Sequence, residues 1–317
     1  MQKIITVTLN TAIDHIIEVP SFTLGKTHRS KNDEAFPSGK GINVTRTLNV
    51  LGKKAVAMGF VGRSSLNFFK TLDSDLCSMQ LTVVDGETRR NISIIDSEQN
   101  ILTHIINPGY EVSNSDLSKL KASFQNYVNN GDIVILSGSL PVGTPASFYK
   151  ELLQICHDKN ALTILDSSGE PLREGLQGKP FMCKPNLDEL EYLAGKELWE
   201  SENKIIEAAR EIMKSGIQLV VVSRGSKGIL AVKNGVDTTW KAFIDKDKVN
   251  LPAICKGSGD ALVAGFAAGY LENREFPDIL RLGVACGAAN LLTPCPGDCN
   301  KEDINRFESM VKVEEIG

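Results

Sequence analysis

Short apolar runs rich in β-branched residues alternate with longer amphipathic segments through most of this 317-residue chain. This alternation is typical of βα units, and it predicts an α/β fold with a mostly parallel sheet and helices on both faces. After residue 256 the pattern becomes purely helical. The expected strands, each bounded by Gly, Pro, Asn or Asp, are 4–9, 55–61, 132–137, 161–166, 181–184 and 218–223. The expected helices are 42–51, 116–129, 145–157, 204–215, 257–271, 277–292 and 301–311.

Two parts of the chain break the alternation, because strand patterns follow one another there without a helix between them. The first is 15–19 with 29–34, and the second is 81–84 with 90–96 and 101–106. Strands joined by short turns pair antiparallel, so these runs either extend the main sheet or form a small separate sheet. Since they flank a glycine-rich segment, we expect a small β-sheet lid, inserted at about 15–35 and 81–106 in a single domain of residues 1–317.

The net charge and the hydropathy of the chain argue against two classes of protein, general nucleic-acid binders and membrane proteins. Lys and Arg number 35 against 39 Asp and Glu, a net charge of −4, so the basic excess that drives general nucleic-acid binding is missing. The longest apolar stretches fall well short of the ~20 residues of a membrane span. The N-terminal residues do not resemble a signal peptide, and we expect a cytoplasmic protein. The seven cysteines are expected to be reduced and mostly buried, with a metal site at Cys295 and Cys299 as the alternative.

A first glycine motif, PSGKGINV at residues 37–44, opens an expected helix. Glycines at such a junction leave backbone N–H groups free at the positive end of the helix dipole. It is not a Walker A loop, because Glu34 and Gly41 stand where that motif requires Gly and Ser or Thr. The motif is therefore either an anion-binding turn with Lys40 beside it or a plain glycine turn with a solvated lysine.

A second motif, CKGSGD at residues 255–260, opens another expected helix. Gly257, Ser258 and Gly259 are small enough for an anion to rest on their amides, and Asp260 is placed to take a proton from an attacking hydroxyl. An anion cradle beside a base is what phosphoryl transfer requires. The alternative is structural, since an Asp in the first turn favours a helix N-terminus.

Three weaker features each have a functional and a structural interpretation. Asn186 and Glu189 share one helix face, which suits oxygen ligation of hydrated Mg²⁺ as well as a capping box. The glycine-spaced segment 223–228 suits either close approach of a nucleotide or a hairpin turn. Arg89 and its neighbour Arg90, at a lid strand, suit either a phosphate clamp or a solvated surface.

Taken together, these segments resemble the PfkB (ribokinase-like) carbohydrate kinases, and in particular the branch with 1-phosphofructokinase and tagatose-6-phosphate kinase. The similarity runs over nearly the whole chain, in the order and at the spacing of that family. It rests on TLNTAID at 8–14, GKGINV at 39–44, GETR at 86–89, SGSLP at 137–141, KPN at 184–186 and GSGD at 257–260.

The resemblance implies a Rossmann-like domain with a β-sheet lid that often supports a homodimer, and it implies ATP and Mg²⁺ as cofactors. It assigns the catalytic base to Asp260 and the anion hole to the amides of Gly257, Ser258, Gly259 and Asp260. The implied substrate-binding residues are Asp14, Gly39 and Asn43 for hydroxyls and Lys40, Arg89 and Arg29 for an existing phosphate. The implied nucleotide and metal residues are Lys184, Asn186, Glu189, Ser223, Gly225, Gly228 and Asn290.

Three positions depart from the family pattern. Ser38 replaces the first glycine of a Gly-Gly-Lys-Gly stretch, Arg224 stands where leucine is usual, and Lys256 precedes the anion-hole glycine. Lys256 either reaches the transferring phosphoryl group or is a solvated surface lysine.

The resemblance therefore implies an ATP-dependent kinase that converts a ketohexose monophosphate to a ketohexose 1,6-bisphosphate. Fructose 1-phosphate would be phosphorylated at O6 and tagatose 6-phosphate at O1. The alternatives are a ribokinase-like enzyme acting on an unphosphorylated sugar or nucleoside, and a catalytically silent sugar-phosphate sensor. Lys40 and Arg89 argue against the first, and Asp260 argues against the second.

Overall fold

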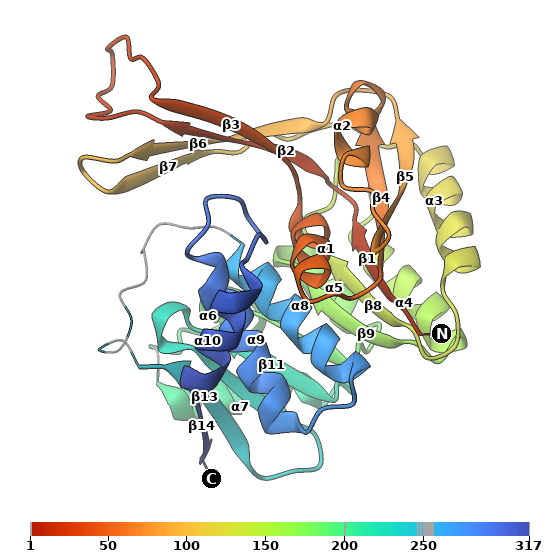
Figure 1. Ribbon diagram of the computed structural model, residues 1–317. Coiled ribbons are helices and arrows are strands. Elements are labelled where there is room, and N and C mark those ends of the chain that lie inside the picture. Colours follow the sequence, from red (N-terminus) through yellow and green to blue (C-terminus); the bar gives the residue numbers. More distant parts are fainter. Residues whose placement is uncertain (1, 200, 246, 248, 250–256, 317) are drawn as a thin grey trace.

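A computed structural model describes the whole chain except residues 1, 200, 246, 248, 250–256 and 317. Its main element is a ten-stranded sheet with helices on both faces (Figure 1). From edge to edge, the strands within the described residues are β14 (Val311–Ile316), β13 (Thr239–Ile244), β12 (Ile229–Lys233), β11 (Leu219–Ser223), β10 (Met182–Cys183), β9 (Leu162–Asp166), β8 (Ile133–Ser137), β1 (Ile4–Thr8), β4 (Ala55–Gly62) and β5 (Cys77–Val84).

The seven strands from β11 to β5 run parallel, which confirms the predicted α/β fold. All six strands expected from the sequence belong to this part of the sheet. β12, β13 and β14 add an antiparallel extension at one edge, which the sequence prediction had missed.

Two hydrophobic clusters cover the two faces of the sheet, because alternate residues of the buried strands point to opposite sides. Ile5 and Val7 pack in one cluster, and Ile4 packs in the other. The first cluster includes α3 (Asn114–Tyr127), α4 (Phe148–Asp158), α5 (Gly169–Leu176), α6 (Leu187–Ala194) and α7 (Glu202–Met213). The second includes α1 (Lys40–Val50), α8 (Ser258–Leu271), α9 (Phe276–Asn290) and α10 (Lys301–Met310).

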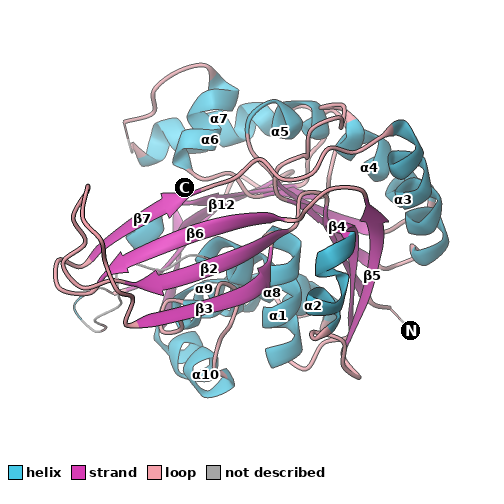
Figure 2. Ribbon diagram, turned by 90° about the horizontal axis from the view of Figure 1, so that it is seen from above, coloured by secondary structure: helices cyan, strands magenta, loops and turns pink. Residues whose placement is uncertain are grey.

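A separate four-stranded sheet extends away from the main body, as Figures 1 and 2 show. Its strand order is β3 (Asn32–Ser38), β2 (Ala12–Glu18), β6 (Arg89–Asp96) and β7 (Ile101–Ile105). We call this sheet the lid. The two outer pairs are antiparallel as expected, whereas the central pair, β2 and β6, is parallel.

Residues 81–84, which were expected in the lid, instead form the end of β5 at the edge of the main sheet. The apolar run begins at Cys77, and Leu81 pairs in parallel with Gly59 of β4. A parallel pair needs a crossover, and the short helix α2 (Leu66–Lys70) provides it. The second lid segment therefore begins with β6.

Six of the seven cysteines lie within the described residues, and all six are buried. None of the helices in the described ranges is long and apolar enough to cross a membrane.

Candidate active site

Polar residues gather where the parallel strands of the main sheet end. β9 ends at Asp166, β10 is followed by Lys184, and β11 ends at Ser223. α1, α6 and α8 begin at the same edge of the sheet. In open α/β sheets ligands bind outside the carboxyl ends of the strands, at the point where the strand order reverses. Here that point lies between β1 and β8.

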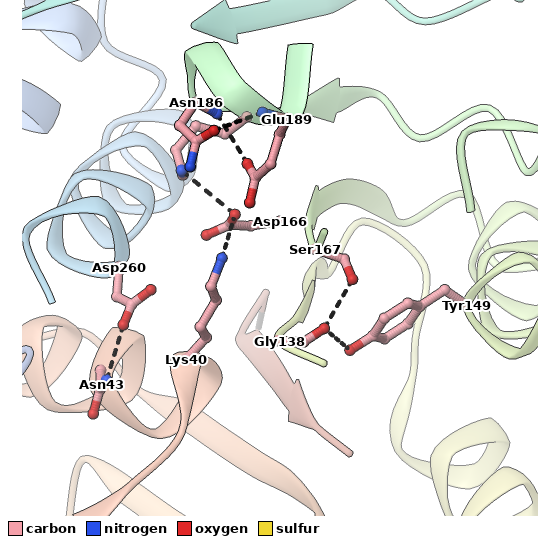
Figure 3. A network of polar contacts seen from close by, with 10 residues as sticks. Lys40, Asn43, Gly138, Tyr149, Asp166, Ser167, Asn186, Glu189 and Asp260 are labelled. Atoms are coloured by element: carbon pink, nitrogen blue, oxygen red, sulfur yellow. Dashed lines mark hydrogen bonds and ion pairs between the residues drawn. The ribbon is translucent and has the colours of Figure 1, made fainter. Parts of the chain in front are cut away.

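A buried carboxylate links two lysines at this edge (Figure 3). Asp166 is 1% exposed, and its Oδ1 lies 3.0 Å from the Nζ of Lys40 and 3.4 Å from the Nζ of Lys184. Its Oδ2 is buried and accepts no hydrogen bond from the protein. Burial would raise the pKa of Asp166, but the charges of Lys184 and Lys40 outweigh it and hold this pKa below its usual value. The carboxylate is therefore ionised at neutral pH and keeps one oxygen for a ligand.

Lys40 is the first residue of α1, which places its ammonium group among several carboxylates. Burial alone would lower the pKa of Lys40, but the negative charges of Asp166, Asp260 and Glu189 raise it above the usual value. Lys40 is therefore a permanent positive charge next to Asp260 rather than a solvated surface lysine.

Asp260 lies in the first turn of α8, and its carboxylate points away from its own helix. The N-cap of α8 is Gly257, and no side chain caps the helix. Instead, Oδ2 of Asp260 accepts a 2.8 Å hydrogen bond from Nδ2 of Asn43 on α1 (Figure 3). The Asp260 side chain therefore makes no capping hydrogen bond to its own helix and is held by Asn43 of another helix instead.

The environment of Asp260 favours its protonated form more than water does. Burial raises its pKa to about 6, and the charge of Asp166 adds to this effect. Lys40, the hydrogen bond from Asn43 and Lys184 act in the opposite direction. A carboxylate with a pKa of about 6 is ionised at neutral pH and is a stronger base than an ordinary aspartate.

Two glycines at the site are required by the backbone. Gly39 has φ of 120°, and a Cβ there would lie 2.6 Å from Cγ2 of Thr8. Gly257 has φ of 94°, and a Cβ there would lie 2.6 Å from the backbone nitrogen of Gly297. Gly39 therefore lets the N-terminus of α1 approach the end of β1, and Gly257 lets the N-terminus of α8 approach the turn at Gly297. The first N–H groups of α8 have no partner within the helix.

Asn186 and Glu189 form the predicted capping box at the start of α6. Oδ1 of Asn186 accepts a hydrogen bond from the Glu189 amide at 2.8 Å, and Oε2 of Glu189 accepts one from the Asn186 amide at 2.9 Å. The Glu189 carboxylate also points toward the Lys40–Asp166 pair in Figure 3. Asn186 and Glu189 therefore cap α6, and the charge of the Glu189 carboxylate still faces the site.

A pocket of about 260 Å³ adjoins the capping box. It is lined by Asn186, Leu187, Asp188, Ser223, Arg224, Gly225 and Lys227. Arg224 is tied to Glu202 by a 2.8 Å ion pair, so its side chain is fixed at the pocket wall. Asn186, Ser223 and Gly225, which were expected at the nucleotide, therefore share one pocket, whereas Gly228 is not among its lining residues.

Other expected site residues have different surroundings. NH2 of Arg89 donates to the backbone oxygen of Asn10 at 3.0 Å, so Arg89 and Lys40 have different partners. Burial lowers the pKa of Arg89, and its Nε is buried without a protein acceptor. Arg29 is exposed and belongs to the segment that joins β2 to β3. This segment forms a loop at the end of the lid away from the main sheet (Figure 1).

Asn290 is completely buried in α9. Its Nδ2 donates to the backbone oxygen of Asp298 at 2.9 Å and to that of Cys295 at 3.2 Å. Its Oδ1 lies close to Gly257, 2.9 Å from where a Cβ of that residue would stand, and Asn290 is not among the residues that line the pocket. Lys256 lies outside the described residues.

Asp14 joins the same polar network from the lid. Its Oδ2 accepts a 2.7 Å hydrogen bond from Ser38, and its Oδ1 accepts a 2.9 Å hydrogen bond from Asn91. Asp14 and Asn43, both expected to bind sugar hydroxyls, are therefore connected through Ser38.

Sequence reasoning missed Asp166, the residue that connects Lys40 and Lys184. No motif surrounds it, because it is a single aspartate followed by two serines. The available signal was its position at the carboxyl end of a predicted parallel strand, where ligand sites occur.

Comparisons with known proteins identify the family of this chain. The model of the pfkB family of carbohydrate kinases matches residues 1–303. The chain is 34% identical to 1-phosphofructokinase of Bacillus subtilis (strain 168) over 314 residues, 99% of this chain and 100% of that protein. Among solved structures, phosphofructokinase-2 of Escherichia coli in complex with fructose-6-phosphate is 27% identical, with a TM-score of 0.88, covering 98% of this chain and 99% of that one. The tetrameric inhibited form of that enzyme has a TM-score of 0.87 at 27% identity and the same coverage. The chain belongs to the PfkB family of carbohydrate kinases.

Proposed function

We propose that this protein is an ATP-dependent kinase of a ketohexose monophosphate, with Asp260 as the base that activates the free primary hydroxyl. The observation on which the proposal depends is the position of the Asp260 carboxylate. It is buried at the N-terminus of α8, is held by Asn43 on another helix, and has Lys40 as a neighbouring positive charge.

The proposed reaction uses these groups in one step. Asp260 accepts the hydroxyl proton as the oxygen forms a bond to the γ-phosphorus of ATP, and the bond from that phosphorus to the β-phosphate oxygen breaks, releasing ADP. The N–H groups of residues 257–260 and the ammonium group of Lys40 stabilise negative charge on the transferring group. Positioning and charge stabilisation of this kind account for most of the catalysis of phosphoryl transfer.

We infer that the substrate already bears a phosphate. The Nε of Arg89 is buried and has no protein acceptor. The negative charge of the lid residue Asp14 acts on the Arg89 guanidinium group and favours its charged form. A guanidinium group suits an anionic phosphate through paired N–H donors, and a neutral sugar would leave it uncompensated. The relatives named 1-phosphofructokinase and phosphofructokinase-2 favour fructose phosphates or the closely similar tagatose 6-phosphate.

We propose that ATP binds at the pocket between α6 and β11. Its lining includes Asn186, Ser223 and Gly225, and Lys184 directly follows the neighbouring strand β10. We propose that these residues contact the nucleotide, as the resemblance implies. An enzyme that uses ATP and a sugar phosphate finds both in the cytoplasm, and we infer that location.

Mg²⁺ suits the oxygen atoms on the side of the site nearest Glu189. Asp166 has a buried Oδ2 without a protein donor, and Glu189 presents a carboxylate to the same region. Within the described residues no group of three His, Cys, Asp or Glu side chains is arranged to hold a metal. Mg²⁺ commonly binds through one or two carboxylates together with substrate phosphates and water, and it would neutralise phosphate charge here.

We propose that the lid also forms a homodimer contact. Ile101, Ile105 and Ile106, on and after β7, are 51%, 47% and 64% exposed. Exposed apolar residues on a strand that forms the edge of the described lid favour pairing with a second copy. Sedimentation of the wild-type protein and of Ile105→Lys would test this, because the variant should shift the mass toward the monomer.

The experiment that tests the function is an ADP-release assay on fructose 1-phosphate, fructose 6-phosphate, tagatose 6-phosphate and the unphosphorylated sugars. We expect the highest kcat/KM for one of the ketohexose monophosphates. A preference for an unphosphorylated sugar or nucleoside would support the ribokinase-like alternative, and sugar-phosphate binding without turnover would support the sensor alternative.

A further inference from the structure

Ser38 is the residue that joins the lid to the reaction centre. It ends β3, it is 1% exposed, and it stands where the family pattern has glycine. Its Oγ lies 2.7 Å from Oδ2 of Asp14 and 3.1 Å from Oδ1 of Asn43. A buried hydroxyl has few ways to satisfy its hydrogen bonds, so these contacts restrict the Ser38 side chain.

The contacts of Asn43 determine which end of its amide faces Asp260. The single proton of the Ser38 hydroxyl is shared, as a bifurcated hydrogen bond, between Oδ2 of Asp14 and Oδ1 of Asn43. Oδ1 of Asn43 also accepts, at 3.3 Å, from NH1 of Arg46. Nδ2 is thereby left to donate to Oδ2 of Asp260 at 2.8 Å. A rotation of the amide by 180° would place two oxygen atoms together at Asp260 and two donors together at Arg46, so the network selects one orientation.

Arg46 is itself fixed, but its contact with Asn43 is the longer one. NH2 of Arg46 donates to the backbone oxygen of Pro37 at 2.6 Å, and NH1 also donates to that of Pro296. Its NH1 is therefore shared between two acceptors. Of these two donors to Oδ1 of Asn43, Ser38 makes the shorter contact, and Ser38 rather than Arg46 also contacts Asp14.

We propose that Ser38 is a positioning residue, whose hydroxyl holds the Asn43 amide in the orientation that donates to Asp260 and couples Asp14 to the same network. Glycine or alanine at this position could not supply the contact. The proposal rests on the proposed role of Asp260 as the base. It goes beyond that role by assigning part of the geometry of the base to a residue of the lid.

The pKa of Asp260 depends on a small set of groups, and Ser38 is not one of them. Lys40, Asp166 and Lys184 are the charged groups that shift its pKa, and Asn43 is its hydrogen-bond donor. Ser38→Ala leaves all four residues in place and removes the hydroxyl contacts to the Asn43 amide and to Asp14. Since a hydrogen bond to an ionised carboxylate favours the ionised form, loss of the ordered Asn43 contact raises the pKa of Asp260.

The test compares Ser38→Ala with the wild-type enzyme over a range of pH. We expect kcat to fall about 3- to 10-fold, which corresponds to one ordinary hydrogen bond. The midpoint of the acid limb of kcat/KM should rise by about half a pH unit, and KM for ATP should stay unchanged. Carbon-13 NMR titration of the Asp260 carboxyl in the free protein, assigned with Asp260→Asn, should show the same rise without turnover.

Two further variants make the outcome decisive. In an Asn43→Ala background, Ser38→Ala should not move the pKa of Asp260 further, because its effect passes through Asn43. Ser93→Ala removes another buried lid hydroxyl, which lies 3.0 Å from Nδ1 of His104, and should leave both the pH midpoint and kcat within about twofold.

The results separate the positioning role from the proposed function. An unchanged Asp260 pKa in Ser38→Ala, or an equal shift in the Asn43→Ala background, would overturn the positioning role. Near-normal turnover by Asp260→Asn would overturn the proposed base, and the NMR titration would still report on Ser38.

Discussion

The Nζ of Lys40 lies 3.0 Å from Oδ1 of Asp166, so the first residue of α1 is tied to the last residue of β9. These residues are 126 positions apart in the sequence. Lys184 adds a second ammonium group to the same carboxylate. One buried charge thus connects the first glycine motif to the Lys-Pro-Asn segment, and it fixes two cations at the place where phosphate groups are expected.

Replacing Asp166 with Asn should lower both stability and activity. The variant leaves Lys184, which is 5% exposed, without its charged partner, and removing one member of a buried ion pair costs about 3 kcal/mol of unfolding free energy. We expect kcat to fall by at least about 100-fold, because both lysines lose their position. Urea unfolding and steady-state kinetics would measure the two effects.

Asp132→Asn is a matched control for Asp166→Asn. Asp132 is also 1% exposed and pairs with a single lysine, Lys3, at 2.7 Å, but it lies at the opposite end of the sheet. It should lose stability without losing kcat in the folded protein. Equal kcat values for the two variants would contradict a role for Asp166 in the site.

Replacing Asp260 with Asn should abolish most turnover and stabilise the fold. Loss of a general base typically lowers kcat by about 10²–10⁴-fold. A buried carboxyl with a raised pKa stabilises the fold most below its unfolded pKa, and this contribution is lost as the pH rises through about 6. At pH 7.5 the neutral amide should therefore raise the unfolding free energy, by on the order of 2 kcal/mol.

Thermal unfolding of both proteins at pH 5 and pH 7.5 would check the second effect, because the advantage of Asn should grow with pH. Turnover near the wild-type level would contradict the proposed mechanism. A loss of stability at pH 7.5 would instead indicate a structural role for the Asp260 charge.

The acid limb of kcat/KM should have a midpoint near pH 6, where Asp260 becomes protonated in the free enzyme. The phosphate of the substrate also titrates near pH 6. Lys40→Gln distinguishes the two, because the charge of Lys40 lowers the pKa of Asp260 and its removal should move the midpoint upward. A midpoint that stays fixed in the variant would assign the limb to the substrate.

The sequence was sufficient for most of the main sheet. Its parallel strands are buried on both faces, so each is a nearly continuous β-branched run that stands out between amphipathic helices. The end of β5 was misplaced because a strand pattern does not show its partner. Only the pairing of Leu81 with Gly59 reveals that it belongs to the main sheet. β12–β14 were missed as an extension of that sheet.

The site was predictable where glycines mark a helix N-terminus, as at Gly39 and Gly257. It was not predictable where a single residue acts through distant contacts. Asp166 and Ser38 contact residues on other elements of the fold, and the sequence around each of them does not predict those contacts. The β2–β3 loop, which contains Arg29, lies at the far end of the lid, and this position is likewise a property of the tertiary structure.

Replacing Arg89 with Ala should raise KM for the sugar phosphate and leave KM for ATP nearly unchanged. A charge-assisted contact to phosphate is worth roughly 1.5–3 kcal/mol, or about 10- to 150-fold in binding. Arg90→Ala is the matched control, because Arg90 is exposed and follows Arg89 on the same strand, so it points to the opposite face. Initial-rate kinetics with each substrate varied would measure both variants.

Arg90→Ala should change both KM values by less than about twofold. An equal rise in KM for sugar phosphate and ATP in Arg89→Ala would contradict the proposed clamp. It would then indicate that the hydrogen bond from Arg89 to the Asn10 backbone maintains the site as a whole.

Replacing Glu189 with Gln separates its capping role from its proposed role at the metal. Glutamine still accepts the hydrogen bond from the Asn186 amide, so the capping box and the melting temperature should be preserved. The negative charge that faces the Lys40–Asp166 pair is lost. The Mg²⁺ concentration needed for half-maximal rate at fixed ATP should therefore rise by about 10-fold, as expected when one charged contact to the ion is removed.

Two control variants test whether the effect of Glu189→Gln comes from helix capping or from the site. Asn186→Ala removes the capping side chain and should lower the unfolding free energy by about 1 kcal/mol. Asp116→Asn alters the equivalent capping box at the start of α3, outside the site, and should leave the Mg²⁺ requirement unchanged. If Glu189→Gln kept both the wild-type melting temperature and the wild-type Mg²⁺ requirement, the Glu189 carboxylate would serve only the helix, and Asp166 would be the remaining carboxylate for the ion.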